Sequence, residues 1–101
     1  MIVEFEAYNK TNNCKGEIIN YNPDRIVDYN NKILVAKELT PLDAVFLLNI
    51  KGAIIENGSL LSHISIFMRE NSKFLLKVKD ISVLKDNCNV DINFDKNIIR
   101  W

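Results

Sequence analysis

Alternating apolar and polar residues open the chain. Val3, Phe5 and Ala7 are apolar and are separated by Glu4 and Glu6. This period of two is typical of a β-strand with one face buried and the other in water. The sequence therefore predicts that the chain begins with a strand.

Most of the remaining pattern also predicts strands. The run over 32–36 is continuous rather than alternating, which is typical of a strand covered on both faces. Together with it, short apolar segments bounded by turn-forming residues predict strands over 16–20, 53–56, 74–78 and 89–93, then a turn over 94–97 and a last strand ending at Trp101.

A first helix is predicted to begin near Thr40 and to run to about Ile50. Thr40 can cap the helix, Pro41 suits its first position, and Asp43 adds negative charge to its first turn. Gly52 is placed to end the helix in a left-handed conformation.

A second helix is predicted from Ser62 to Asn71, and it contains the only histidine of the chain, His63. A helix start leaves backbone N–H groups unpaired and its dipole favours an anion, so this position suits a phosphoryl group. An incidental histidine, and a plain helix cap at Ser62, are the simpler alternatives when the motif is considered alone.

The predicted order of strand, helix, strand, helix and strand between Lys32 and Val78 implies parallel pairing through right-handed crossovers. We therefore expect the α/β class, with a mixed sheet core and two principal helices. Because the chain has 101 residues and no internal repeat or linker, we expect a single domain over residues 1–101.

The composition argues against several classes of partner. Hydrophobic residues make up 48% of the chain and charged residues 26%, as in ordinary folded proteins. Thirteen basic and thirteen acidic residues cancel, which argues against a nucleic-acid or anionic-membrane partner. Because no segment has the pattern of a membrane span or a secretory signal, we expect a cytoplasmic protein.

Two cysteines, Cys14 and Cys88, lie far apart in the sequence and lack the spacing of metal ligands. We therefore predict neither a zinc site nor any other metal site. Two free thiols are the simplest interpretation for a cytoplasmic protein, and a disulfide between the two cysteines is the open alternative.

Five segments carry a resemblance to a known family: 32–36, Thr40-Pro41, 52–55, the stretch from Gly58 through Ser62-His63 to Ile66, and Arg69-Glu70. They resemble, in order and spacing, the mobile phosphohistidine domain of the phosphoenolpyruvate-utilising enzymes. Pyruvate phosphate dikinase, phosphoenolpyruvate synthase, enzyme I of the phosphotransferase system and rifampin phosphotransferase share that domain. The likeness extends over most of the chain, from Cys14 to Trp101.

The resemblance implies a swivelling β/β/α domain that carries a phosphoryl group. It implies that His63 accepts this group and passes it on, and that Gly58, Ser59 and Ser62 bind the phosphate through backbone N–H groups and hydroxyls. No cofactor is implied on the domain itself. ATP, phosphoenolpyruvate and Mg are expected on partner domains, namely a nucleotide-binding and a phosphoenolpyruvate/pyruvate-binding domain of the same or a partner chain. The phosphotransferase would be incomplete without them.

The sequence departs from the family pattern beside the histidine. Ser59 stands where the family has a second glycine, and Leu61 stands where it has a threonine that resembles a regulatory switch site. Leu61 cannot be phosphorylated, and Ser59 enters a left-handed backbone less freely than glycine does. These departures support an alternative function, a degenerate non-catalytic swivelling domain that acts as a protein-binding or docking module.

Overall fold

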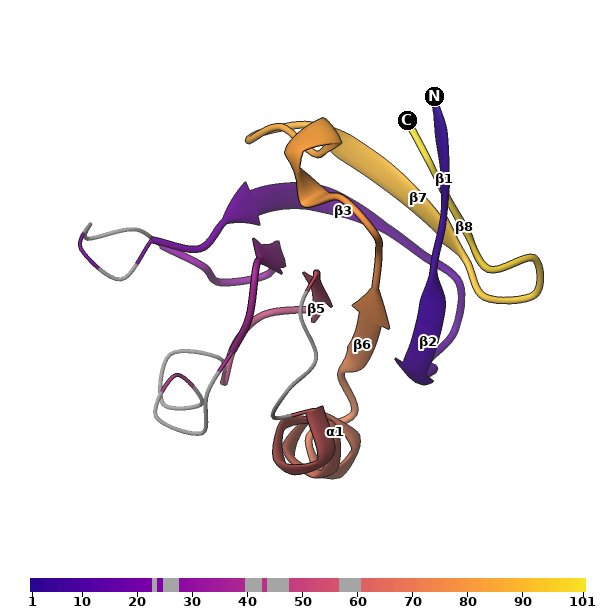
Figure 1. Cartoon of the computed structure of the whole chain (residues 1–101). Coiled ribbons are helices and arrows are strands. Elements are labelled where there is room, and N and C mark those ends of the chain that lie inside the picture. The colour runs from indigo at the N-terminus through magenta and orange to yellow at the C-terminus, as the bar shows by residue number, and fades with distance from the viewer. Residues whose placement is uncertain (23, 25–27, 40–42, 44–47, 57–60) are drawn as a thin grey trace.

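The structure is a computed structural model that describes the chain except residues 23, 25–27, 40–42, 44–47 and 57–60; for residues 61–63 it describes the backbone. Eight strands, one α-helix and one 3₁₀ helix are present in these described ranges (Figure 1). In chain order they are β1 (Ile2–Glu4), β2 (Glu6–Asn9), β3 (Cys14–Asn20), β4 (Ile33–Ala36), β5 (Gly52–Ile55), α1 (Leu61–Glu70), β6 (Phe74–Lys77), η2 (Ile81–Val83), β7 (Asn89–Asn93) and β8 (Ile98–Arg100).

The eight strands form one sheet in the order β1-β8-β7-β3-β4-β5-β6-β2. β1 pairs antiparallel with β8 at one edge, and β2 pairs antiparallel with β6 at the other. Only Phe5 separates β1 from β2 in the chain. Because neighbouring Cα atoms are about 3.8 Å apart, the sheet has to curve until its two edges almost meet. The result is a nearly closed, barrel-like sheet.

Phe5 lies between the two edge strands, β1 and β2, and contacts the turn before β8. Its backbone N–H donates to the carbonyl oxygen of Asn97 at 3.0 Å, and its side chain is only 7% exposed. The ring meets the ring of Phe94 edge-on, with centroids 5.7 Å apart, an arrangement that adds to the energy of burial. The apolar position that the alternating pattern identifies is therefore the point at which the barrel closes.

Parallel pairing joins β3 to β4, β4 to β5, and β5 to β6, which confirms the parallel pairing expected between Lys32 and Val78. β4 is buried on both faces, as its continuous apolar run predicts. Ile33 and Val35 belong to an inner core to which side chains from all eight strands contribute. Leu34 and Ala36 belong to an outer core.

The helix α1 covers the outer face of the sheet, beside β6 and β2 (Figure 1). Ile64 and Met68 lie one turn apart on the same side of the helix, and both are buried in the outer core with Leu75 of β6. The connection from β5 through α1 to the parallel β6 is therefore the crossover that the sequence predicts.

The predicted fold class, an α/β swivelling β/β/α domain with two principal helices, is wrong. The molecule consists mostly of strands, and one α-helix is present among the described residues. Most of the helix predicted from Thr40 to Ile50 lies outside them; Asp43 is in a 3₁₀ turn, and Leu48 and Asn49 form a turn. The prediction assumed an open sheet that needs helices on its faces, whereas the closed sheet supplies most of its own core.

Gly52 does not end a helix in a left-handed conformation, because no described glycine has a positive φ. It opens β5 instead. A Cβ atom at this position would overlap the ring of Phe74 on the neighbouring strand. Glycine is therefore required here by the close approach of that ring and not by a turn.

Candidate functional site

The first turn of α1 lies at the carboxyl end of the parallel strands. The chain leaves β5 after Ile55, α1 begins at Leu61, and the helix then returns along the sheet to the start of β6. His63 is the third residue of α1. The backbone N–H groups of a first helical turn have no partner within the helix, and residues 57–60, which precede this turn, lie outside the described residues.

The predicted site residues fall into two groups. Gly58 and Ser59 lie outside the described residues. Ser62 and His63 lie in the first turn of α1, and the structure describes their backbone. The helix start is therefore where the sequence predicts it to within one residue, whereas the roles of the four side chains stay predictions.

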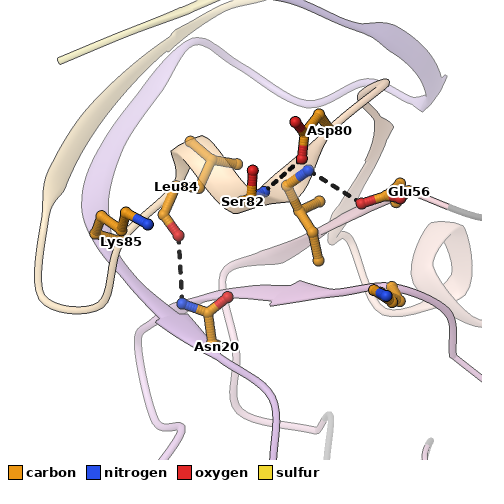
Figure 2. A pocket seen from close by; sticks show the side chains of 8 residues that line it. Asn20, Glu56, Asp80, Ser82, Leu84 and Lys85 are labelled. Atoms are coloured by element: carbon orange, nitrogen blue, oxygen red, sulfur yellow. Dashed lines mark hydrogen bonds between the residues drawn. The ribbon is translucent and has the colours of Figure 1, made fainter.

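A pocket with a mixed polar and apolar lining lies open to solvent at the carboxyl end of the parallel strands (Figure 2). Its volume is about 460 Å³. The last residue of β3 and the residues that follow β4 and β5 meet the segment around η2 there. The lining consists of Asn20, Lys37, Glu56, Asp80, Ile81, Ser82, Leu84 and Lys85. In sheets with parallel strands, ligands bind beyond the carboxyl ends of the strands.

Glu56 connects the end of β5 to η2. Its backbone N–H donates to the carbonyl oxygen of Lys37 at 3.2 Å, which continues the pairing of β4 and β5 by one residue. Its carboxylate oxygen Oε2 accepts the backbone N–H of Ile81 at 3.2 Å (Figure 2). The backbone and side chain of Glu56 are therefore held by different parts of the fold.

Asp80 caps η2. Its Oδ1 accepts the backbone N–H of Ser82 at 2.9 Å. Hydrogen bonds from the hydroxyl and the backbone of Ser82 lower the pKa of Asp80, and the nearby charge of Lys85 lowers it further, against a small opposing effect of burial. Asp80 is consequently a carboxylate at neutral pH, so Glu56 and Asp80 both direct acceptor oxygens at the backbone of η2.

The two lysines of the pocket, unlike its carboxylates, make no hydrogen bond to a described residue through their side chains. Lys37 and Lys85 are both exposed, and neither ammonium group donates a hydrogen bond to any described residue. Both lysines border the pocket and are exposed to solvent, whereas the carboxylates of Glu56 and Asp80 accept backbone N–H groups.

Asn20 fixes the far wall of the pocket. Its backbone N–H and its side-chain Nδ2 both donate to Asp86 Oδ1, at 2.6 and 2.9 Å, and Nδ2 lies 3.3 Å from the carbonyl oxygen of Leu84. These bonds attach the segment after η2 to the end of β3.

A pair of tyrosines extends the polar edge beyond β3. The hydroxyl of Tyr21 donates to Asp43 Oδ1 at 2.8 Å, and the rings of Tyr21 and Tyr29 lie 5.6 Å apart. Burial, and then the bond to Asp43, raise the pKa of the Tyr21 phenol above its ordinary value. Tyr21 is therefore a neutral hydrogen-bond donor throughout the physiological pH range.

Sequence reasoning missed the pocket residues. Lys37 comes directly after the strand predicted over 32–36, and Glu56 was predicted as the last residue of the strand over 53–56, whereas β5 ends one residue before it. The rule that parallel strands meet at their carboxyl ends could have identified both. Asp80 and Lys85 carried no such signal, because η2 is a short element that only the fold brings to this edge.

The two cysteines cannot form a disulfide within the chain. Cys14 is the register partner of Ile92, whereas the carbonyl oxygen of Cys88 accepts the N–H of Ile18 at 2.9 Å. Four residues along a strand span about 13 Å, and a disulfide requires Cα atoms within about 7 Å. Both thiols are free, and burial raises the pKa of Cys14.

The described part of the chain contains neither a group of metal ligands nor a membrane-spanning helix. No three side chains of histidine, cysteine, aspartate or glutamate are grouped there as they would be around a metal ion. No helix there has the length and apolar character needed to cross a membrane.

The chain is similar along almost its whole length to two solved structures. A chain of holo-form aconitase X from Thermococcus kodakaraensis has a TM-score of 0.76 and 14% sequence identity, with 99% of this chain and 97% of that chain covered. A UPF0107 protein, solved by solution NMR, has a TM-score of 0.75 and 14% identity, with 99% and 98% covered. A search among curated proteins found no relative.

These structures correct the assignment to particular enzymes that the sequence resemblance suggested. The assignment to the phosphohistidine domain of the dikinases, synthases, enzyme I and rifampin phosphotransferase is wrong, because an aconitase X and a UPF0107 protein are among the structures that match almost the whole chain. The segments that carried the resemblance largely build β4, β5 and α1. Such segments specify a fold, and one fold hosts unrelated chemistries.

The sequence from β4 to the end of β7 nevertheless matches a known family. A family model described as "PEP-utilising enzyme, mobile domain" matches residues 28–95, which is more than half of the chain and includes α1 and the pocket residues that follow β4 and β5. The chain belongs to this family of mobile domains of PEP-utilising enzymes.

Proposed function

We propose that the chain is a phosphoryl-carrier domain, in which His63 accepts a phosphoryl group and passes it to a second site. The observation that carries this proposal is the position of His63 in the first turn of α1, at the carboxyl end of parallel strands and within the matched region 28–95. Backbone N–H groups at a helix start stabilise a bound phosphoryl group.

The proposed step is a displacement at phosphorus. A neutral ring nitrogen of His63 attacks with its lone pair and forms a P–N bond, while the P–O bond to the donor breaks and the leaving oxygen keeps the electron pair. In the second half of the cycle an acceptor oxygen forms a new P–O bond, and the ring nitrogen recovers its lone pair. Gly58, Ser59 and Ser62 are proposed to hold the phosphoryl oxygens through backbone N–H groups and hydroxyls.

The proposed domain needs partners to complete a reaction. ATP, phosphoenolpyruvate and Mg would be bound by a nucleotide-binding and a phosphoenolpyruvate/pyruvate-binding domain, between which this domain moves. Two free thiols agree with the reducing cytoplasm as its compartment.

The test incubates the full chain with phosphoenolpyruvate and a PEP-utilising phosphotransferase, and in parallel with phosphoramidate as a small phosphoryl donor. Wild type is expected to acquire a phosphate that is labile in acid and stable in base, and His63→Ala none. Ser65→Ala, a substitution two residues later in the same helix, should keep the label. An unlabelled wild type, under conditions that load another domain of the family, would overturn the proposal.

A second candidate is the docking module that the departures at Ser59 and Leu61 support. The observation in its favour is the structural likeness, over almost the whole length of both chains, to a chain of aconitase X. In this case, the edge that carries the pocket would bind a partner protein without becoming phosphorylated. The same experiment distinguishes the two candidates, because the docking module predicts no label on wild type from either donor.

A further inference from the structure

We propose that the open side of β1 binds an extended, uncharged segment of a partner protein. The segment pairs with the backbone of β1 on one side and with the backbone of Lys79 on the other. This inference does not depend on the proposed function, because the segment contacts no residue of the predicted site and none that lines the pocket in Figure 2. It rests on the direction of backbone groups and on a cavity between the two segments.

Half of the backbone groups of β1 point away from its neighbour β8. In an antiparallel pair, every second residue exchanges hydrogen bonds with the residue opposite. The N–H of Phe5 donates to the carbonyl oxygen of Asn97 at 3.0 Å, and two bonds, at 2.6 and 3.1 Å, join the first residue of the chain to the last. The odd-numbered residues therefore bond to β8, and the N–H and C=O groups of Ile2 and Glu4 point to the open side of this edge strand.

Lys79 forms the other side of the open edge. Glu6 pairs with Lys77, and the same register continued by two residues brings Glu4 opposite Lys79. The N–H of Val78 donates to β5 at 2.9 Å, so the N–H of the next residue points the other way, towards β1. No described residue accepts this N–H of Lys79. Unpaired backbone groups therefore border the gap from both sides.

A cavity of about 290 Å³ lies between the two segments, and it is lined by Glu4, Phe5, Glu6, Lys77, Val78 and Lys79. The side chains of Phe5 and Val78 are only 7% and 2% exposed and belong to the inner core. The chain bends at Lys79, and the carboxylate of Glu56 then holds the N–H of Ile81. Because β1 is held by β8, a different neighbour fixes each side of the gap.

Unpaired groups on both sides identify the kind of partner. A strand added at a sheet edge is held mainly by backbone hydrogen bonds. A second copy of the chain offers edge strands that already pair on one side, so such a strand could bond to β1 but not to Lys79 as well. An extended segment without a strand neighbour has both of its sides available. The gap therefore fits a single segment and not a second copy.

The side chains beside the gap favour an uncharged segment. Glu4 and Lys79 are both exposed, and a side chain between them meets one negative and one positive charge, so neither sign is preferred. Ile2 is 58% exposed and favours an apolar group opposite it. Val3 packs against the inner core, so the alternate side chains of the segment should be apolar. Threonine alternating with valine meets these conditions and has a high strand propensity.

The probe is a short peptide of alternating threonine and valine with blocked ends, titrated into the full chain and followed by amide NMR. The amide signals of Ile2, Glu4 and Lys79 should shift, and their hydrogen exchange should slow by a factor on the order of 3 or more, because each N–H gains an acceptor. The amide of Ile18 already donates to Cys88 at 2.9 Å and should stay unchanged.

Two methylated peptides test whether both sides pair. The N–H groups of an extended segment alternate between its two sides, so methylation of the threonine nitrogens blocks one side and methylation of the valine nitrogens blocks the other. Each methylated peptide should bind more weakly by a factor on the order of 10. A loss with only one of them would show addition to a single edge and overturn the proposal.

Glu4→Pro and Glu4→Ala separate the backbone from the side chain at one position. Proline removes an N–H that points into the gap and not towards β8, so the pairing of β1 with β8 keeps its bonds. Glu4→Pro should lower the affinity by a factor on the order of 10, and Glu4→Ala should bind within about threefold of wild type. If Glu4→Pro does not fold, the methylated peptides test the same pairing on the wild-type chain.

Three results would overturn the proposal: no shift of these amides at millimolar peptide, equal binding by folded Glu4→Pro, or self-association. In the last case the chain alone would dimerise in sedimentation and protect the same amides, so a second copy would occupy the edge. None of these results bears on the labelling of His63, and the phosphoryl-carrier function is therefore tested separately.

Discussion

The two ends of the parallel strands use charged residues in opposite ways. At the amino end, a lysine comes directly before each of β4, β5 and β6. Lys32 binds Glu17 at 2.7 Å, Lys51 donates to the carbonyl oxygen of Lys15 at 2.9 Å, and Lys73 donates to that of Ile50 at 2.6 Å. These lysines join neighbouring segments of the fold.

At the carboxyl end the arrangement is reversed. Carboxylates, from Glu56 and Asp80, bind backbone N–H groups of η2. The ammonium groups of Lys37 and Lys85 donate to no described residue and border the pocket. The comparison shows that the lysines at the amino end hold neighbouring segments together, whereas those at the carboxyl end border a pocket and are exposed to solvent.

The largest effect is expected from Gly52→Ala, at the amino end of β5. The added methyl group overlaps the ring of Phe74 in the inner core, and we expect a loss of about 2–3 kcal/mol in the free energy of unfolding, measured with urea. Gly16→Ala is the control, because its Cβ would meet Ile33 at 3.0 Å, near the end of a flexible side chain. An equal loss in both variants would contradict the argument from ring contact.

A smaller effect is expected at the ion pair of Glu17 and Lys32. The two side chains are about one-third exposed, at 33% and 31%, so a double-mutant cycle with Glu17→Ala and Lys32→Met should give a coupling of about 0.5–1 kcal/mol that decreases with salt. Lys37→Met, at the other end of β4, should change stability by less than about 0.5 kcal/mol. A larger loss in Lys37→Met would remove the contrast between the two edges.

The smallest effect is expected from the charge of Asp80 at the carboxyl end. Its folded-state pKa lies below the ordinary value of 3.8 because of the bonds from Ser82, so the charge stabilises the fold above that pH. This stabilisation is lost as the pH falls through the lowered pKa. Asp80→Asn should therefore be less stable than wild type at pH 7, and the difference should shrink as urea titrations move from pH 4 to pH 2. A difference independent of pH would exclude this role of the charge.

The site could be predicted from sequence only where its parts are local. The helix that bears His63 follows from a turn, a cap and an apolar run within a dozen residues, and α1 is found there. The pocket could not be predicted in the same way, because Asn20, Glu56 and Asp80 come from segments more than twenty residues apart. Their meeting depends on which strand ends lie side by side.

The sequence by itself determined most of the strands, the helix α1 and the parallel pairing, because alternation, apolar runs and turn residues act over a few neighbours. It predicted a single strand at the start of the chain, where the structure has β1 and β2. It did not determine the closure of the sheet. That depends on β1 and β2 pairing with β8 and β6, partners that lie far along the chain, while only Phe5 joins β1 to β2. Only the tertiary structure decided that the sheet closes into a barrel and brings η2 to the ends of β3 and β5, because backbone pairing carries no local signal of its partner.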